Sequence, residues 1–288
     1  MTRVLLLGAS GMLGSSLAPR LEAAGHIVFQ QSRSDGYDIK LDLLSHQAWI
    51  DCLGKVQPET IVNLAAATNV DQCERNPQWA FDANIGPLLA LVRASCSTKI
   101  RPHIVHISTD QLYDGKGPHS EAHVRPCNVY ALSKFAAELV IKEYPATIIR
   151  TNFFGLSYAQ GRPSFSDWII KSIKSKKQIT LFNDVFFSAI HMDTLCYFIN
   201  LAIEKRPQGT FNVGTHDGIS KAEFGLQLAS RLGLATKTIR VGSVDELDLK
   251  ARRPLDMRMK TIHFQDQFGV STPSMSTEIN KAVDEYHA

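Results

Sequence analysis

The chain has 288 residues, of which 44% are hydrophobic and 20% are charged, and its formal net charge at pH 7 is +3. A chain of this length and composition folds into one large domain or two ordinary ones, which excludes an intrinsically disordered protein. The small positive excess requires no nucleic-acid or membrane partner, although it suits an anionic small molecule.

The N-terminal segment and the cysteines predict a cytoplasmic protein. The apolar run Val4–Leu7 ends at Gly8, so this run is too short for the apolar core of a signal peptide. No window approaches the ~20 apolar residues that cross a bilayer. The five cysteines are widely spaced without a Cys-x-x-Cys motif, and the ten histidines are scattered. We therefore expect reduced thiols and no metal site.

The first half of the chain alternates short apolar runs with amphipathic stretches, a pattern typical of parallel β/α units. Apolar residues at helical spacing predict a first helix from Met12 to beyond Leu21, followed by Gly25 in a left-handed conformation. Further helices are expected over Leu88–Cys96 and Phe135–Tyr144. The predicted strands are Val4–Leu7, Ile27–Gln31, Thr60–Ala65, His103–Ser108 and Ala146–Arg150.

After Arg150 the alternation becomes less regular. Helices are expected over Phe165–Ser175, over Thr194–Glu204 and from a cap at Ser220 to Leu232, and short strands over Ile179–Phe182 and Thr210–Val213. The fold class predicted is therefore α/β: a doubly wound parallel sheet (Rossmann) over residues 1–152, followed by a smaller mixed α/β substrate-binding part over residues 153–288. Some segments of the second part are expected to return to the main sheet.

A glycine-rich segment, Gly8-Ala9-Ser10-Gly11-Met12-Leu13-Gly14, joins the first predicted strand to the first helix. Gly8 permits a tight turn, Gly11 lets backbone N–H groups approach a pyrophosphate, and Gly14 lets the helix pack closely against the sheet. Glycines can also serve a turn alone, but this position at the first strand–helix junction favours a dinucleotide.

The end of the second predicted strand indicates which dinucleotide binds. An acidic residue there would hydrogen-bond the ribose 2′-hydroxyl of NAD, and Phe29–Ser34 contains none. Arg33 could instead hold a 2′-phosphate, because a guanidinium matches phosphate geometry. A solvated surface charge is the alternative for Arg33. The pattern favours NADP(H) and leaves NAD(H) open.

Tyr130 and Lys134 are spaced for acid–base catalysis. At ~100° per residue, a separation of four places both side chains on one face of a helix. A phenol is a poor acid at neutral pH, and a nearby ammonium lowers its pKa towards the operating range. Such pairs are also common on helix surfaces.

Upstream of this pair, a predicted strand ends in Ser108 and Thr109. Open α/β sheets bind ligands at the carboxyl ends of their strands, so Thr109 could orient a substrate carbonyl.

Together these segments resemble an extended short-chain dehydrogenase/reductase, and in particular the dTDP-4-dehydrorhamnose reductase branch. The resemblance covers essentially the whole chain, and its motifs are more specific for the superfamily than for the branch. The matching segments are Gly8–Gly14, Val62–Asp71, Ser108–Asp110, Asn128–Lys134, Arg150–Phe153, Asn212–Gly214 and Arg253-Pro254.

The resemblance implies a role for individual residues. Thr109, Tyr130 and Lys134 would be catalytic, and Asp110 would lie near the sugar. The residues that would bind the cofactor are Gly8, Ser10, Gly11, Met12, Leu13, Arg33, Asp42, Leu43, Ala65, Ala66, Ala67, Ser108, Tyr130 and Lys134. A homodimer is compatible with the resemblance.

The sequence departs from the branch around the expected sugar pocket. Gln111 stands where these reductases often have tyrosine, Phe153 stands in place of tryptophan, and Phe187–His191 lacks the usual Gly-x-Pro-Thr. The expected substrate-binding residues are Asp110, Gln111, Phe153 and Arg253. The other cations considered for a substrate diphosphate are Arg252, Arg258, Lys171 and Lys174. His191 and Asp193 could also touch the substrate, but a helix-capping role explains Asp193 at least as well.

The function predicted is NADP(H)-dependent reduction of a nucleotide-linked 4-keto-6-deoxy sugar, with Tyr130 as proton donor. Dehydration is disfavoured, because related dehydratases have Asp-Glu where this chain has Asp110-Gln111, and an amide cannot abstract a proton. Two alternatives remain open: a sugar-nucleotide epimerase, and a non-catalytic NADP-binding subunit resembling the regulatory subunit of methionine adenosyltransferase.

Overall fold

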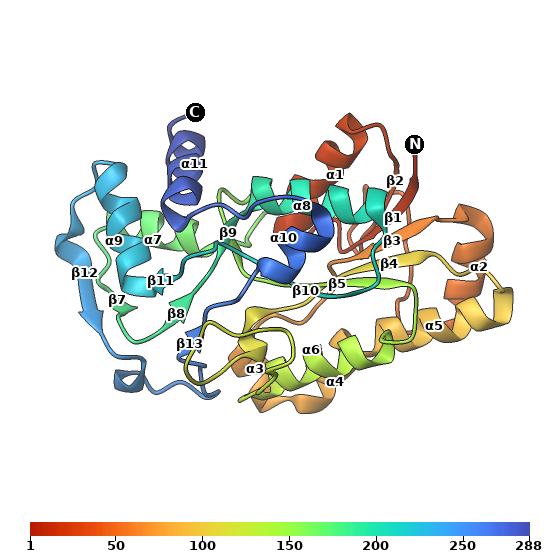
Figure 1. Cartoon of the computed structure of the whole chain (residues 1–288), viewed down its shortest axis with the longest axis horizontal. Helices are drawn as coiled ribbons and strands as arrows, with labels where there is room; N and C mark the ends of the chain where they lie inside the picture. Colours follow the sequence, from red (N-terminus) through yellow and green to blue (C-terminus); the bar gives the residue numbers. More distant parts are fainter.

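The computed structural model describes residues 1–288, and at its centre is a six-stranded parallel sheet (Figure 1). The strand order is β10-β5-β4-β3-β1-β2, and every neighbouring pair is parallel. The order reverses beside β1, which makes the sheet doubly wound and confirms the predicted fold class. The strands are β1 (Arg3–Leu7), β2 (Ile27–Gln31), β3 (Thr60–Asn63), β4 (His103–Ile107), β5 (Ala146–Thr151) and β10 (Gly209–Val213).

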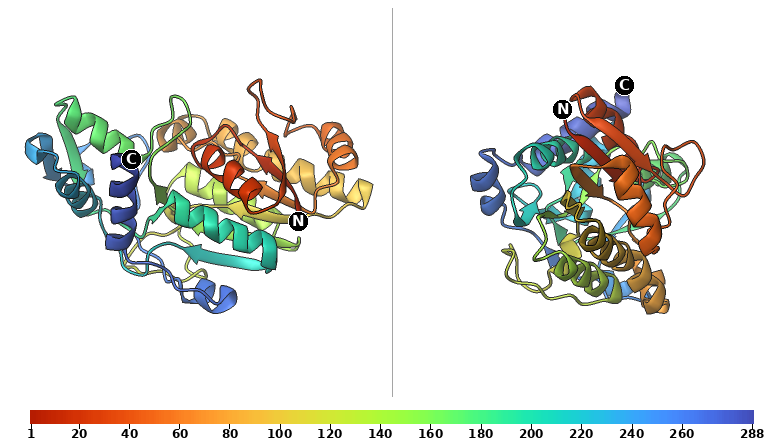
Figure 2. Two further views of the ribbon diagram at one scale, coloured as in Figure 1. Left: turned by 90° about the horizontal axis from the view of Figure 1, so that it is seen from above. Right: turned by 90° about the vertical axis from the view of Figure 1, so that its right-hand side faces the viewer.

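Helices cover both faces of the sheet, as the end-on view of Figure 2 shows. One face packs against α1 (Met12–Ala23), α8 (Met192–Lys205) and α10 (Ile262–Phe268). The opposite face packs against α2 (His46–Val56), α5 (Gly86–Thr98) and α6 (Val129–Val140). Two short helices, α3 (Val70–Arg75) and α4 (Pro77–Asn84), lie against α6.

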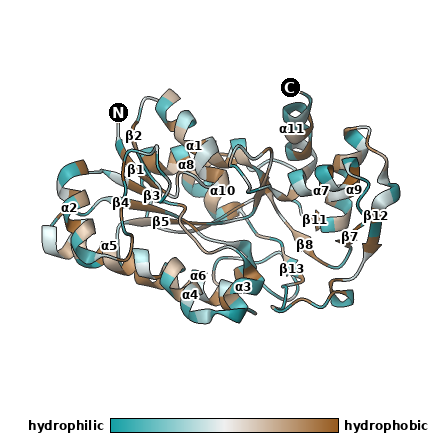
Figure 3. Cartoon of the chain, turned by 180° about the vertical axis from the view of Figure 1, so that it is seen from behind, coloured by the Kyte–Doolittle hydropathy of each residue, from teal (hydrophilic) through white to brown (hydrophobic).

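The sequence explains these elements locally. Val4, Leu5, Leu6 and Leu7 are all fully buried, because a strand covered on both faces needs apolar side chains at every position. The flanking helices carry both hydrophilic and hydrophobic residues in Figure 3, as expected of helices with one buried face. Gly25 follows α1 with a φ of +86°, the left-handed conformation predicted for it.

The remaining elements form a C-terminal lobe with its own hydrophobic core. Its helices are α7 (Phe165–Lys174), α9 (Lys221–Arg231) and α11 (Met275–His287). Its strands are β6 (Phe153–Phe154), β7 (Ile179–Phe182), β8 (Phe186–Phe187), β9 (Ile190–His191), β11 (Ile219–Ser220), β12 (Ile239–Gly242) and β13 (Asp256–Met257). Ser220 caps α9 as predicted, and Glu223 completes a capping box by accepting the Ser220 backbone N–H.

The chain returns from this lobe to the central sheet. Strand β10, the last strand of the central sheet in chain order, pairs with β5, and α8 packs beside α1. Residues 192–213 therefore belong to the sheet layers although they follow residue 152. The boundary between residues 152 and 153 stays a prediction. No helix combines the length and the hydropathy that a membrane span requires.

Candidate active site at the carboxyl ends of the sheet

The glycine turn after β1 has no space for side chains. Gly8 has a φ of +77°, and a Cβ there would lie 3.1 Å from the Ala65 backbone nitrogen. A Cβ on Gly14 would lie 2.5 Å from the Gly8 carbonyl oxygen, so α1 could not approach the strand so closely with any other residue. The turn therefore presents bare backbone at the N-terminus of a helix, which suits a pyrophosphate.

A cavity of about 540 Å³ opens over this turn, between the ends of β1 and β4 and the start of α6. Most of the predicted cofactor residues line it, together with Phe153 from β6. Those that the cavity brings together are Gly8, Gly11, Met12, Leu13, Arg33, Ala66, Ala67, Ser108, Tyr130 and Lys134.

The remaining predicted cofactor residues do not line the cavity. Ser10 accepts a hydrogen bond from the Ser32 hydroxyl at 2.8 Å, at the rim beside Arg33. Asp42 accepts the Leu44 N–H, and the Leu43 carbonyl accepts from an indole N–H. Ala65 is held by the Asn63 side chain. These four residues shape the surrounding loops in this structure.

Arg33 is exposed and forms no ion pair, so its guanidinium is free to bind an anion. Gln31, at the end of β2, accepts the Gly8 N–H and donates to the Leu41 carbonyl, which fixes its amide beneath the glycine turn. The Asp38 carboxylate near this strand end is engaged by the Gln30 backbone N–H at 2.9 Å, so Arg33 is the free charged group there, as expected for binding of a 2′-phosphate.

Tyr130 and Thr109 meet beside this cavity. Tyr130 is 7% exposed, and burial raises the pKa of its phenol to about 12; the Thr109 side chain hydrogen bond opposes that rise and Asp110 adds to it. The expected lowering of the Tyr130 pKa by Lys134 is wrong: burial is the largest influence on the phenol, and Lys134 is not among the groups that shift its pKa. The phenol is therefore protonated at neutral pH, which is the state of a proton donor.

Lys134 lies on the same helix as Tyr130 and reaches β4. Its Nζ donates to the Ile107 carbonyl oxygen at 2.7 Å and lies 3.4 Å from Nε2 of His106. Burial lowers the pKa of Lys134 to about 8, while Glu138 raises it. Lys134 is thus anchored to β4, the strand that directly precedes Ser108 and Thr109.

The expected substrate residues occupy different surroundings. Asp110 is 1% exposed and accepts from the Asn152 amide at 2.8 Å, and burial raises its pKa to about 6. Gln111 accepts a hydrogen bond from Asn128 at 3.4 Å, at the start of α6. Arg253 forms an ion pair with Asp71 at 2.8 Å, so its guanidinium already has a partner.

Two cations that the sequence analysis did not single out lie near the predicted site residues. Arg162 lines the cavity, and its Nη1 lies 3.8 Å from the point where a Cβ on Gly11 would lie. Lys221 begins α9 with its Nζ 5.5 Å from the centre of the Phe165 ring and forms no ion pair. Burial lowers the pKa of Lys221, and Asp110 opposes this. Neither cation lies in a motif, so spacing along the chain holds no signal for them.

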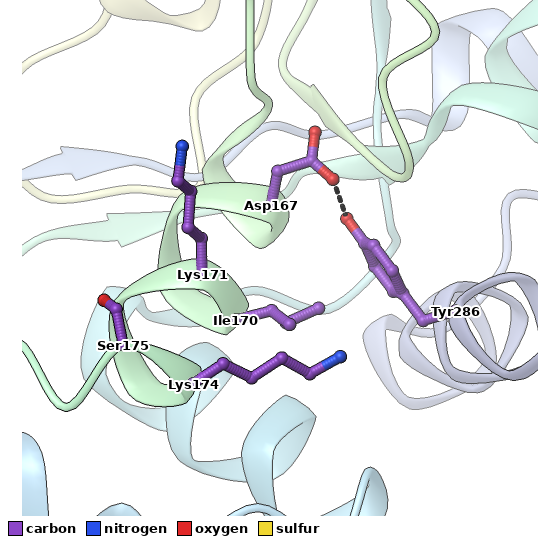
Figure 4. Close-up of a pocket in the computed structure, with 6 residues that line it drawn as sticks. All are labelled: Asp167, Ile170, Lys171, Lys174, Ser175 and Tyr286. Carbon is purple, nitrogen blue, oxygen red and sulfur yellow. Dashed lines mark hydrogen bonds between the residues drawn. The ribbon is translucent and has the colours of Figure 1, made fainter.

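The four other cations considered for the diphosphate lie elsewhere. Lys171 and Lys174 line a separate hollow of about 600 Å³ between α7 and α11, where the Tyr286 hydroxyl donates to Asp167 at 2.6 Å (Figure 4). Arg252 forms an ion pair with Asp114, and Arg258 forms one with Asp256. None of the four lines the cavity of Tyr130.

His191 and Asp193 show how a cap can be misassigned. The sequence suggests a capping role for Asp193, yet His191 occupies the N-cap position of α8 and accepts the Asp193 N–H. The Asp193 carboxylate instead pairs with Arg20 at 2.6 Å, joining α8 to α1.

Comparison with known proteins gives one consistent result. The family model described as RmlD substrate binding domain matches residues 1–288. The spore coat polysaccharide biosynthesis protein SpsK of Bacillus subtilis is 31% identical over 88% of this chain and 87% of its own length. The dTDP-4-dehydrorhamnose reductase of Escherichia coli K12 is 26% identical over 98% of this chain and 97% of its own.

Solved structures show the same fold. A dTDP-4-dehydrorhamnose reductase from Bacillus anthracis, in complex with NADP, superposes with a TM-score of 0.88 at 24% identity and covers 99% of both chains. A hypothetical dTDP-4-dehydrorhamnose reductase from Sulfolobus tokodaii gives a TM-score of 0.81 at 32% identity, covering 94% of this chain and 95% of its own.

Proposed function

The chain belongs to the family described as RmlD substrate binding domain, and from this we propose that it is an NADP(H)-dependent reductase of a nucleotide-linked 4-keto-6-deoxy sugar. It is an oxidoreductase acting on a sugar-nucleotide ketone. The names of its relatives in Escherichia coli and Bacillus anthracis support this substrate class.

One observation carries the proposal. The glycine turn, Ser108, Tyr130 and Lys134 line a single cavity, and Thr109 lies close enough to the Tyr130 phenol to oppose the rise of its pKa. A binding module needs only the glycine turn. The buried phenol and amine beside it are the groups that a ketone reduction uses, which supports catalysis.

The residues present fit the nicotinamide dinucleotide. The bare glycine turn would hold the pyrophosphate, Arg162 would add a positive charge there, and Arg33 would bind the 2′-phosphate. When bound, NADPH supplies the hydride that reduces the ketone. The chain's own residues then position the carbonyl and provide the proton.

Tyr130 donates its proton to the ketone oxygen. Its raised pKa keeps the phenol protonated until the oxygen gains negative charge. Thr109, beside it, donates a hydrogen bond to the same oxygen and so fixes the carbonyl in position.

The residues that follow β4, together with the C-terminal lobe, would bind the rest of the substrate. Asp110 would accept a sugar hydroxyl, with Gln111 and Phe153 at the sides of the sugar. Arg253 was the cation proposed for the diphosphate, but its pairing with Asp71 leaves Lys221 as the free cation near Asp110. A free ammonium attracts a diphosphate more strongly than a paired guanidinium does.

The test is a panel of nucleotide-linked 4-keto-6-deoxy sugars assayed for oxidation of NADPH and NADH. We expect turnover with NADPH that falls by about 10²-fold or more in Tyr130→Phe, with NADPH affinity retained. An epimerase would convert its sugar without net NADPH consumption, and a regulatory subunit would bind NADPH and remain inert towards every sugar. Undiminished turnover in Tyr130→Phe would remove the role assigned to the phenol.

A further inference from the structure

His106 is fully buried, and its ring lies beside Lys134, one of the residues that line the cavity. It stands on β4 directly beside Asn63 of β3 in the parallel register, so the two side chains share one face of the sheet. Helix α6 covers that face and brings Lys134 to the other side of the imidazole ring. The ring therefore lies between an amide and an amine.

The orientation of the Asn63 amide is determined by the backbone. Its Oδ1 accepts the Ala65 N–H at 3.1 Å, so the –NH₂ group is the part that faces His106 Nδ1, also at 3.1 Å. An –NH₂ group can only donate, which means that Nδ1 must accept and carry no proton.

The proton of His106 is consequently on Nε2. Burial, and then the charge of Lys134, lower the pKa of His106 well below its ordinary value, so the ring is neutral and has one N–H. That N–H points to Nζ of Lys134 at 3.4 Å. Only an uncharged amine has a lone pair to accept it, whereas an ammonium would bring two donors together.

We propose that His106 is a positioning residue, held by Asn63 in the tautomer protonated on Nε2, and that its N–H favours the amine form of Lys134 over the ammonium. The Ile107 carbonyl accepts from Lys134 in either form and so does not choose between them. The His106 ring is therefore the group that favours the amine form of Lys134 over the ammonium.

The other charged and titratable groups around Lys134 do not oppose this arrangement strongly. Tyr130 on α6 is a neutral phenol at physiological pH. Glu138, one turn further along α6, favours the ammonium, but its carboxylate is already bound by Arg150 of β5 at 2.6 Å and by Ser108 at 2.5 Å. Its attraction for Lys134 is therefore shared with a closer cation.

The consequence for turnover rests on the proposed function. When the Tyr130 O–H bond breaks and its proton passes to the ketone oxygen, a phenolate remains. The Lys134 ammonium can re-form that O–H bond by giving up one proton, and the nitrogen keeps the electron pair. The resulting amine accepts from His106 Nε2–H, and a solvent proton later restores the ammonium. His106 thus stabilises the form of Lys134 that the proton transfer produces.

The direct test is ¹⁵N NMR of the wild-type protein with labelled histidine, at neutral pH and without substrate. We expect Nδ1 of His106 to show the shift of an unprotonated nitrogen and Nε2 that of a protonated one. A ring protonated on Nδ1, or on both nitrogens, would overturn the proposal. This measurement needs no variant, so it does not depend on whether a substituted protein folds.

Two substitutions then test the effect on Lys134, whose pKa is followed by NMR of lysine labelled at Cε. His106→Gln keeps a donor, because the Asn63 –NH₂ holds the new carbonyl oxygen and turns the amide N–H towards Lys134; we expect little change in pKa. In Asn63→Asp the carboxylate accepts a hydrogen bond from a protonated Nδ1, which leaves Nε2 as an acceptor for the ammonium. We expect the Lys134 pKa to rise by about one unit or more.

The controls distinguish the effect of the His106 tautomer on the Lys134 pKa from the effect of a new charge and from the effect of losing a buried histidine. Asn63→Asp in a His106→Leu background measures the effect of the new carboxylate alone, and its pKa rise should be smaller than with His106 present. His103→Gln removes another buried histidine of β4, one bonded to Thr147, and should leave Lys134 unchanged. Equal rises in the two Asn63→Asp backgrounds would overturn the proposal. Absence of reductase activity would overturn the proposed function and leave these NMR results standing.

Discussion

Replacing Glu138 by glutamine tests how much the buried ion pair with Arg150 stabilises the fold beneath the active site. Both side chains are 4% exposed. Arg150 donates to the Glu138 carboxylate at 2.6, 3.0 and 3.1 Å, and the Ser108 hydroxyl donates to it at 2.5 Å. Helix α6, strand β5 and the end of β4 therefore meet at one carboxylate.

The size of the effect follows from what Arg150 retains. Removing one partner of a buried ion pair costs about 3–5 kcal/mol, because the other charge stays buried without compensation. In Glu138→Gln the guanidinium keeps the Tyr113 hydroxyl at 2.9 Å and the Glu121 carbonyl at 2.7 Å, and glutamine still offers one acceptor. We therefore expect the lower end of that range, about 3 kcal/mol.

Equilibrium unfolding in urea, followed by circular dichroism, measures this loss. The matched control is Glu59→Gln, which breaks the pair with Arg206 at 3.0 Å, where the side chains are 39% and 46% exposed. An exposed pair contributes about 0–1 kcal/mol. If both variants lose less than about 1 kcal/mol, the reasoning from burial is wrong.

Three further predictions concern the site. Burial raises the pKa of Asp110 from 3.8 to about 6, so the folded protein holds a proton that the unfolded chain releases, and stability should fall as pH rises between those values. The total is about 3 kcal/mol, and urea unfolding of Asp110→Asn across that range should lack this slope. Arg33→Ala should raise the KM for NADPH by about tenfold or more while the KM for NADH stays constant, in steady-state kinetics; equal changes would contradict 2′-phosphate binding. Gly14→Ala, whose Cβ would lie 2.5 Å from a carbonyl oxygen, should destabilise by about 1–3 kcal/mol. Gly54→Ala, in an open helical position, should be neutral or stabilising, and thermal unfolding of both variants measures the difference.

Local sequence patterns predicted a helix or strand correctly where its physical cause lies within a few residues of the chain. The run Val4–Leu7 predicts a strand covered on both faces, Gly25 ends α1 through its left-handed φ, and Ser220 caps α9. Helices such as α2 and α11 were not predicted individually. Asp193 was assigned to a cap because nothing in the sequence shows that Arg20, 173 positions earlier, lies beside it.

The same division holds for the site. Glycine spacing and the Tyr-x-x-x-Lys pair are local to one turn and one helix, so the sequence alone determined Gly8, Gly11, Gly14, Tyr130 and Lys134 as candidates. Arg162 and Lys221 come from a loop and a helix start in the C-terminal half, and only folding brings them to the cavity or beside Asp110.

Tertiary structure also decided protonation. The sequence indicates that a lysine near a tyrosine lowers the tyrosine pKa, but burial in the folded chain raises the pKa of Tyr130 and lowers that of Lys134. The tautomer of His106 likewise depends on Asn63, which is 43 positions away in the chain and adjacent in the sheet. Residue spacing determines which groups a helix presents on one face. The charge of those groups depends on their burial and their hydrogen-bond partners. Both are set by strands that are distant in sequence, so only the packed sheet could decide the charge.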